Sequence, residues 1–103
     1  MIITIRSAAG PKPTVVLRNP DDFTAFKIAR APGASPEDVA LTLPAVGRPA
    51  GASHAYVSVP ALKLLAGERA RDRRWLAQLD DMCTYAQSKG WMDELGGIRA
   101  HIE

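Results

Sequence analysis

The chain has 103 residues, of which 47% are apolar, and its 13 Lys/Arg against 11 Asp/Glu give a formal net charge of +2. This length predicts one small α+β domain over residues 1–103, and the near-balance of charge leads us to expect no nucleic-acid partner. No apolar run is long enough to span a bilayer, and the lone Cys83 excludes an intramolecular disulfide, so we expect no membrane partner and a cytoplasmic location.

The first elements in chain order are two short strands. The segments "MIITIR" and "PTVVLR", at 1–6 and 13–18, are rich in β-branched residues. The segment "SAAGPKP" between them is typical of a turn. We therefore predict a hairpin with a long loop.

Two helix-start signals follow the hairpin. Asn19 and Pro20 suit the cap and the first position of a helix, which predicts a short helix over about 20–30. The segment 36–43 repeats these signals, but its apolar residues also alternate as they do in a strand. The sequence leaves that segment open between helix and strand, and its flanks are typical of loops.

The second half of the chain contains the clearest helix. The segment "HAYVSV" at 54–59 predicts a strand, followed by a helical turn that Gly67 ends. Apolar residues then recur at helical spacing over about 72–89, and Gly90 suits the left-handed position after the last turn. The final segment, 98–103, predicts another strand.

Together these elements predict a two-layer sandwich. We expect four to five mostly antiparallel strands, with the long helix (about 72–89) and shorter helices packed on one face. The predicted core is made of the apolar residues on one side of these elements: Ile3, Ile5, Val15, Leu17, Val57, Val59, Leu76, Leu79, Cys83, Ile98 and Ile102.

Most chemical motifs fail on their context. Glu68 and Asp72 are interleaved with the four arginines of "GERARDRRW", so we interpret this segment as a solvated helix start. "GASHA" resembles a nucleophile elbow, but it precedes a strand instead of a helix. The two histidines lie 47 positions apart in the chain, and Cys83 falls on the apolar helix face. We therefore predict no cofactor and no metal site.

The polar side of the predicted sheet is the best candidate site. Strand alternation puts His54, Tyr56 and Ser58 on one face, opposite the apolar residues of the same strand. In the last strand the same rule places Arg99 and His101 on that face. A neutral histidine can act as a base near pH 7, and an arginine can hold an anion. The candidate catalytic residues are therefore His54, His101 and Tyr56, and the candidate substrate-binding residues are Arg99 and Ser58.

These features lead to two functional hypotheses. The first is a small cytosolic ligand-binding or protein-interaction module that forms a homodimer through the polar sheet face or an exposed strand edge. The alternative is a cofactor-free acid/base enzyme of the isomerase, dehydratase or cyclase type, acting on a small anionic substrate at that face. The sequence leaves open whether the protein is an enzyme.

Overall fold

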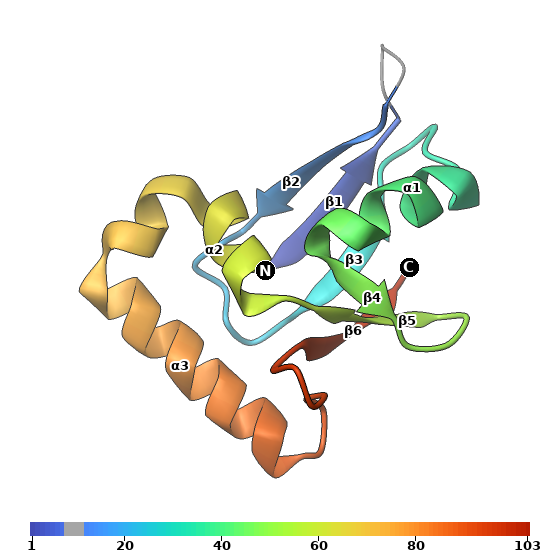
Figure 1. Cartoon of the computed structure of the whole chain (residues 1–103). Coiled ribbons are helices and arrows are strands. Elements are labelled where there is room, and N and C mark those ends of the chain that lie inside the picture. Colours follow the sequence, from blue (N-terminus) through green and yellow to red (C-terminus); the bar gives the residue numbers. More distant parts are fainter. Residues whose placement is uncertain (8–11) are drawn as a thin grey trace.

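The computed structural model describes residues 1–7 and 12–103, and its strands form one six-stranded sheet in the order β2-β1-β3-β6-β5-β4. The strands are β1 (Ile2–Arg6), β2 (Thr14–Arg18), β3 (Lys27–Arg30), β4 (Gly47–Pro49), β5 (His54–Val57) and β6 (Ile98–Ile102). The helices are α1 (Pro36–Val46), α2 (Val59–Ala66), the short 3₁₀ helix η1 (Gly67–Arg71) and α3 (Arg73–Ser88) (Figure 1). Within the described residues, no helix is long and apolar enough to cross a membrane.

The sheet is mixed. β1 pairs antiparallel with β2, and β5 pairs antiparallel with β4 and β6, whereas the β1–β3 and β3–β6 pairings are parallel. The α+β class and the antiparallel pairing of the first two strands are confirmed, although the loop between them includes residues 8–11, which lie outside the described residues. The prediction of four to five strands is wrong, because β3 and β4 lie where we predict a helix and a loop. Among the described residues, three of the five strand pairings are antiparallel and two are parallel.

The segment 20–30 shows why a helix prediction fails here. Residues 20–24 form turns in which Asp22 Oδ1 accepts hydrogen bonds from the Thr24 amide at 3.0 Å and from the Thr24 hydroxyl at 2.6 Å. Asn19, the predicted cap, has a φ of +50°, whereas the cap residue of a helix has an extended backbone, so no helix begins there. The chain then enters β3, because Ile28 becomes completely buried between β1 and β6.

The segment that the sequence leaves open is helical. Ser35 and Asp38 form a capping box, with the Asp38 amide donating to Ser35 Oγ at 3.2 Å and the Ser35 amide donating to Asp38 Oδ2 at 2.8 Å. Val39, Leu43 and Val46 are the buried apolar residues of this helix and follow helical spacing. The cap therefore decides the first turn, and one apolar stripe decides the rest.

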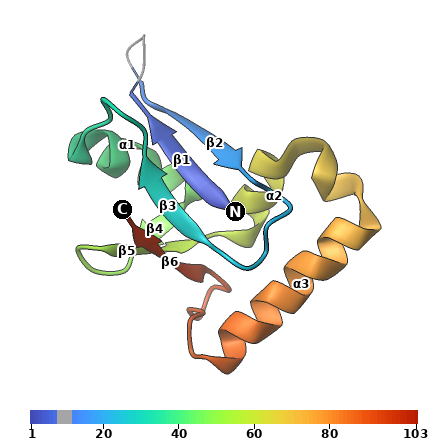
Figure 2. The same cartoon turned by 180° about the vertical axis from the view of Figure 1, so that it is seen from behind.

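Helices α1 and α2 cover one face of the sheet. They lie in front of the strands in Figure 1 and behind them in Figure 2, where β1, β3 and β6 are not covered by any helix. Of the predicted core, five residues are buried and six are partly buried, in that order: Ile3, Ile5, Val57, Leu79 and Ile98, then Val15, Leu17, Val59, Leu76, Cys83 and Ile102. Fully buried residues absent from the predicted core include Met1, Ile28 and Leu62.

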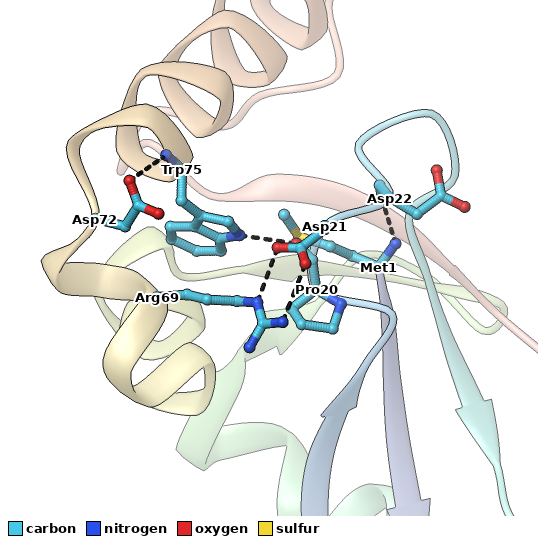
Figure 3. A network of polar contacts seen from close by, with 7 residues as sticks. All are labelled: Met1, Pro20, Asp21, Asp22, Arg69, Asp72 and Trp75. Atoms are coloured by element: carbon cyan, nitrogen blue, oxygen red, sulfur yellow. Dashed lines mark hydrogen bonds and ion pairs between the residues drawn. The ribbon is translucent and has the colours of Figure 1, made fainter.

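Helix α3 lies beyond the ends at which β1, β3 and β6 begin, and not on one face of the sheet with the shorter helices as predicted (Figures 1 and 2). Figure 3 shows how its first turn is attached to the loop between β2 and β3. Trp75, which is 2% exposed, donates its indole N–H to the Pro20 carbonyl at 2.8 Å. Nearby, Arg69 forms a bidentate ion pair with Asp21 at 2.8 and 3.0 Å. These contacts hold α3 at the end of the sheet.

Candidate functional site

The surface of the sheet opposite α1 and α2 gathers most of the candidate site residues, and we call it the open face. Strand alternation and the observed register place these side chains on it: Ile2, Thr4, Arg6, Val16, Arg18, Lys27, Arg48, His54, Tyr56, Arg99, His101 and Glu103. Only Thr4 is buried among them, because Val16 and Ala29 flank it in the neighbouring strands. The other side chains are exposed or half-buried.

The two histidines lie directly opposite each other on this face. His54 in β5 pairs with His101 in β6, and their ring centroids are 5.1 Å apart with an interplanar angle of 67°. The Ser53 hydroxyl lies 3.1 Å from Nδ1 of His54. Desolvation, followed by the positive charges of Arg99 and His101, lowers the pKa of His54. This shift favours the neutral form of His54.

Tyr56 and Arg99 form the next row of the open face. They are register partners, and Tyr56 also pairs with Arg48 of β4. The Arg48 guanidinium lies 5.5 Å from the centroid of the Tyr56 ring and forms an ion pair with Asp93 at 2.7 Å. Within the described residues, Arg99 makes no ion pair, so its exposed guanidinium is available to an anion.

A small cleft opens beside Arg99. Its volume is about 170 Å³, and its walls come from α3, the loop between β2 and β3, and the start of β6. The lining residues are Phe23, Thr24, Phe26, Met82, Tyr85, Ala86, Trp91, Ile98 and Arg99. The rings of Tyr85 and Trp91 meet edge to face, with centroids 5.9 Å apart. The sequence does not predict this cleft, because the signals at Asn19 and Pro20 favour a helix that would contain Phe23 and Phe26.

Ser58 already has a structural partner. Its hydroxyl caps α2 by accepting a hydrogen bond from the Ala61 amide at 3.3 Å. It also lines a second cavity of about 490 Å³, together with Tyr56 and Asp93. The structure therefore brings His54, His101, Tyr56 and Arg99 together on the open face and places Ser58 at its margin.

Asp93 supports this margin of the site. Its side chain is only 5% exposed, and its oxygens accept hydrogen bonds from Arg48 and from the amides of Leu95 and Gly97. Burial raises the pKa of Asp93, but the hydrogen bonds from Gly97 and Arg48 outweigh it, so the pKa lies below its ordinary value. The ionised side chain of Asp93 therefore connects β4, through Arg48, to the turn before β6.

Two other titratable groups, Glu103 and Cys83, have shifted pKa values. Glu103 forms an ion pair with Lys27 at 2.8 Å, and this contact lowers the pKa of Glu103. Burial raises the pKa of the Cys83 thiol on α3. In residues 1–7 and 12–103, no group of three or more His, Cys, Asp or Glu side chains could hold a metal ion. Comparison with protein-family models, curated proteins and solved structures finds no match to this chain.

Proposed function

We propose that the protein is a small binding module whose open face takes a small anionic ligand at Arg99. The observation that carries this proposal is the position of the exposed Arg99 guanidinium. It lies between β5, which carries His54 and Tyr56, and the aromatic cleft. In the described part of the chain, Arg99 makes no ion pair. An arginine in this setting offers two parallel N–H donors to a carboxylate or phosphate.

The surroundings of Arg99 narrow the chemistry of the ligand. Tyr56, the register partner of Arg99, can donate its hydroxyl to the same anion. The cleft volume of about 170 Å³ is close to the roughly 150 Å³ cavity that accepts a benzene ring. The ligand that fits best is therefore an anion attached to one small apolar ring.

Ligand-dependent thermal stabilisation tests this proposal, because a ligand that binds only the folded state raises the melting temperature. Benzoate, acetate and inorganic phosphate serve as probes on the wild type, on Arg99→Ala and on Arg6→Ala. We expect benzoate to give the largest shift, Arg99→Ala to abolish it, and Arg6→Ala, a change at the far end of the open face, to leave it intact. Trp91→Ala should weaken the benzoate response alone. Equal benzoate shifts in Arg99→Ala and the wild type would contradict the proposal.

A homodimer is part of the same proposal. In the described part of the chain, β2 and β4 are the two edges of the sheet, and the half-buried apolar residues Ile2 and Val16 lie on the open face. A second copy can cover either feature. Sedimentation velocity at high micromolar concentration should show a dimer that Tyr56→Ala weakens, whereas a strict monomer would remove this part.

The free thiol of Cys83 supports a reducing compartment such as the cytoplasm.

The second candidate is a cofactor-free acid/base enzyme acting on the anion at the open face. It is favoured by the lowered pKa of His54 next to Tyr56 and Arg99. His54 can take a proton from a carbon beside the carboxylate while Tyr56 donates a hydrogen bond to the developing negative charge. Exchange of that carbon's hydrogen for deuterium, followed by NMR with acetate and with phenylacetate, which both have hydrogens on this carbon, should slow by roughly 10²- to 10⁴-fold in His54→Gln. Exchange at the wild-type rate in His54→Gln would exclude this role.

A further inference from the structure

We propose that His54 and His101 together form a binding site for a divalent transition-metal ion of the zinc, nickel and copper class. This inference goes beyond the proposed function and does not depend on any anionic ligand. It contradicts the prediction of no metal site, which rests on the separation of the two histidines along the chain. His54 and His101 are 47 positions apart in the sequence, but the register of β5 and β6 places them directly opposite each other.

The spacing of the rings suits two ligands of one ion. Two imidazoles that bind one Zn²⁺ at Zn–N distances of about 2.0–2.1 Å and near a tetrahedral angle bring their ring centroids to about 5 Å. The His54 and His101 centroids are 5.1 Å apart. Their observed angle of 67° can adjust through the exposed His101 ring, since rotation of an imidazole about its second side-chain torsion is soft.

The backbone and a neighbouring hydroxyl prepare the pair. Both histidines stand on strands that pair over four register positions, and the bond from the Ile102 amide to the Ser53 carbonyl at 2.8 Å extends this pairing. The Ser53 hydroxyl at Nδ1 of His54 sets the ring orientation and leaves Nε2 available. Within the described residues, the His101 ring has no hydrogen-bond partner. Binding of a metal ion by the two histidines therefore costs little conformational entropy.

The surrounding charges define the kind of site. Imidazole nitrogen suits zinc, nickel and copper, whereas calcium and magnesium require oxygen ligands. The carboxylate of Glu103, two positions after His101, is held by Lys27, and the described residues offer no third ligand. The remaining coordination positions are then open to water or to a bound anion. The exposed positive charge of Arg99 weakens the attraction for a cation, so we expect moderate affinity.

Isothermal titration calorimetry of the full chain tests the metal site in a non-coordinating, anion-poor buffer. Zn²⁺, Ni²⁺ and Cu²⁺ are titrated into the wild type, His54→Gln and His101→Gln. We expect one ion per chain, with Cu²⁺ bound most tightly. Each single histidine variant loses one of two protein ligands and should bind Zn²⁺ at least about tenfold more weakly. The absence of binding by all three ions, or equal Zn²⁺ affinity in the wild type and both variants, would overturn the proposal.

Matched controls separate this site from others. Cys83→Ser should keep wild-type Zn²⁺ affinity, because the thiol lies on α3 and not on the open face. Arg99→Ala should lose the benzoate response but bind Zn²⁺ as well as the wild type or more tightly, so the two proposals fail separately. Paramagnetic Ni²⁺ should broaden the NMR signals of the two imidazoles first. Selective broadening elsewhere would place the ion away from His54 and His101. Unchanged melting temperatures of the histidine variants without metal would show that both remain folded.

Discussion

The two faces of the sheet are built from the same strands but differ in almost every property. In β5, Ala55 and Val57 are 1% and 0% exposed beneath the helices, whereas the alternate residues His54 and Tyr56 are half-buried on the open face. Apart from Arg30, which pairs with Ile5 at the end of β3, the strand side chains of the covered face are apolar, and the open face carries histidine, tyrosine and arginine side chains. The comparison indicates that the covered face supplies most of the folding stability, so that the open face can be changed at little cost to the fold.

The sharpest test of this comparison uses two adjacent residues of β1. Ile5 is completely buried under the helices, and Arg6 is exposed on the open face. Ile5→Ala should lower the free energy of unfolding by about 2–5 kcal/mol, because it removes apolar contacts and leaves a cavity. Arg6→Ala should change it by no more than about 0.5 kcal/mol. Urea denaturation measures both, and similar losses in the two variants would break the contrast between the faces.

Gly47 tests the attachment of β4 to this sheet. A Cβ at this position would lie 1.8 Å from the backbone oxygen of Tyr56, so alanine cannot fit without displacing the strand. Gly47→Ala should cost about 1–3 kcal/mol of unfolding free energy through overpacking. Gly33→Ala is a control with open space around its Cβ, but its φ of +89° is strained for alanine, so it should cost about 1–2 kcal/mol for a different reason. A loss well below about 1 kcal/mol in Gly47→Ala would mean that β4 tolerates the displacement.

The attachment of α3 compares a buried bond with an exposed ion pair. Trp75→Phe removes the N–H that satisfies the Pro20 carbonyl, and we expect it to cost about 1–2 kcal/mol in unfolding free energy. Arg69→Ala breaks the exposed pair with Asp21, which water and salt already screen, so its melting temperature should stay near that of the wild type. Thermal unfolding measures both variants, and a larger loss in Arg69→Ala would reverse the ranking.

Asp93 is the expected exception at the margin of the open face, and its effect depends on pH. Its folded pKa is lowered, so the unfolded chain binds the proton more readily. The stability that Asp93 contributes is therefore fully present above its unfolded pKa of about 3.9 and is lost as the pH falls through the lower, folded pKa. Melting temperatures measured from neutral to acidic pH should fall more steeply for the wild type than for Asp93→Asn. Parallel curves would show that the charge of Asp93 is not coupled to folding.

Local sequence signals determined the elements that depend on their own residues. Helix α3 follows from apolar periodicity, and Gly90 adopts the expected left-handed φ of 75° after it. Alternation correctly separates buried from less buried side chains in β5 and β6, but the predicted strand 54–59 ends at Val57, because Ser58 and Val59 begin α2. These patterns are readable because the apolar period of a helix or a half-buried strand is set by its backbone geometry.

Only the tertiary structure decided the features that depend on distant partners. The signals at Asn19 and Pro20 suit a helix start and a turn equally well, and burial of Ile28 between two strands selects the strand. The short strand β4 exists because Gly47 can pass against the Tyr56 backbone. The facing of His54 and His101 likewise depends on strand register. Register is set by the packing of the whole sheet and not by either strand's own residues, which is why the sequence could place each histidine on a face but not opposite the other.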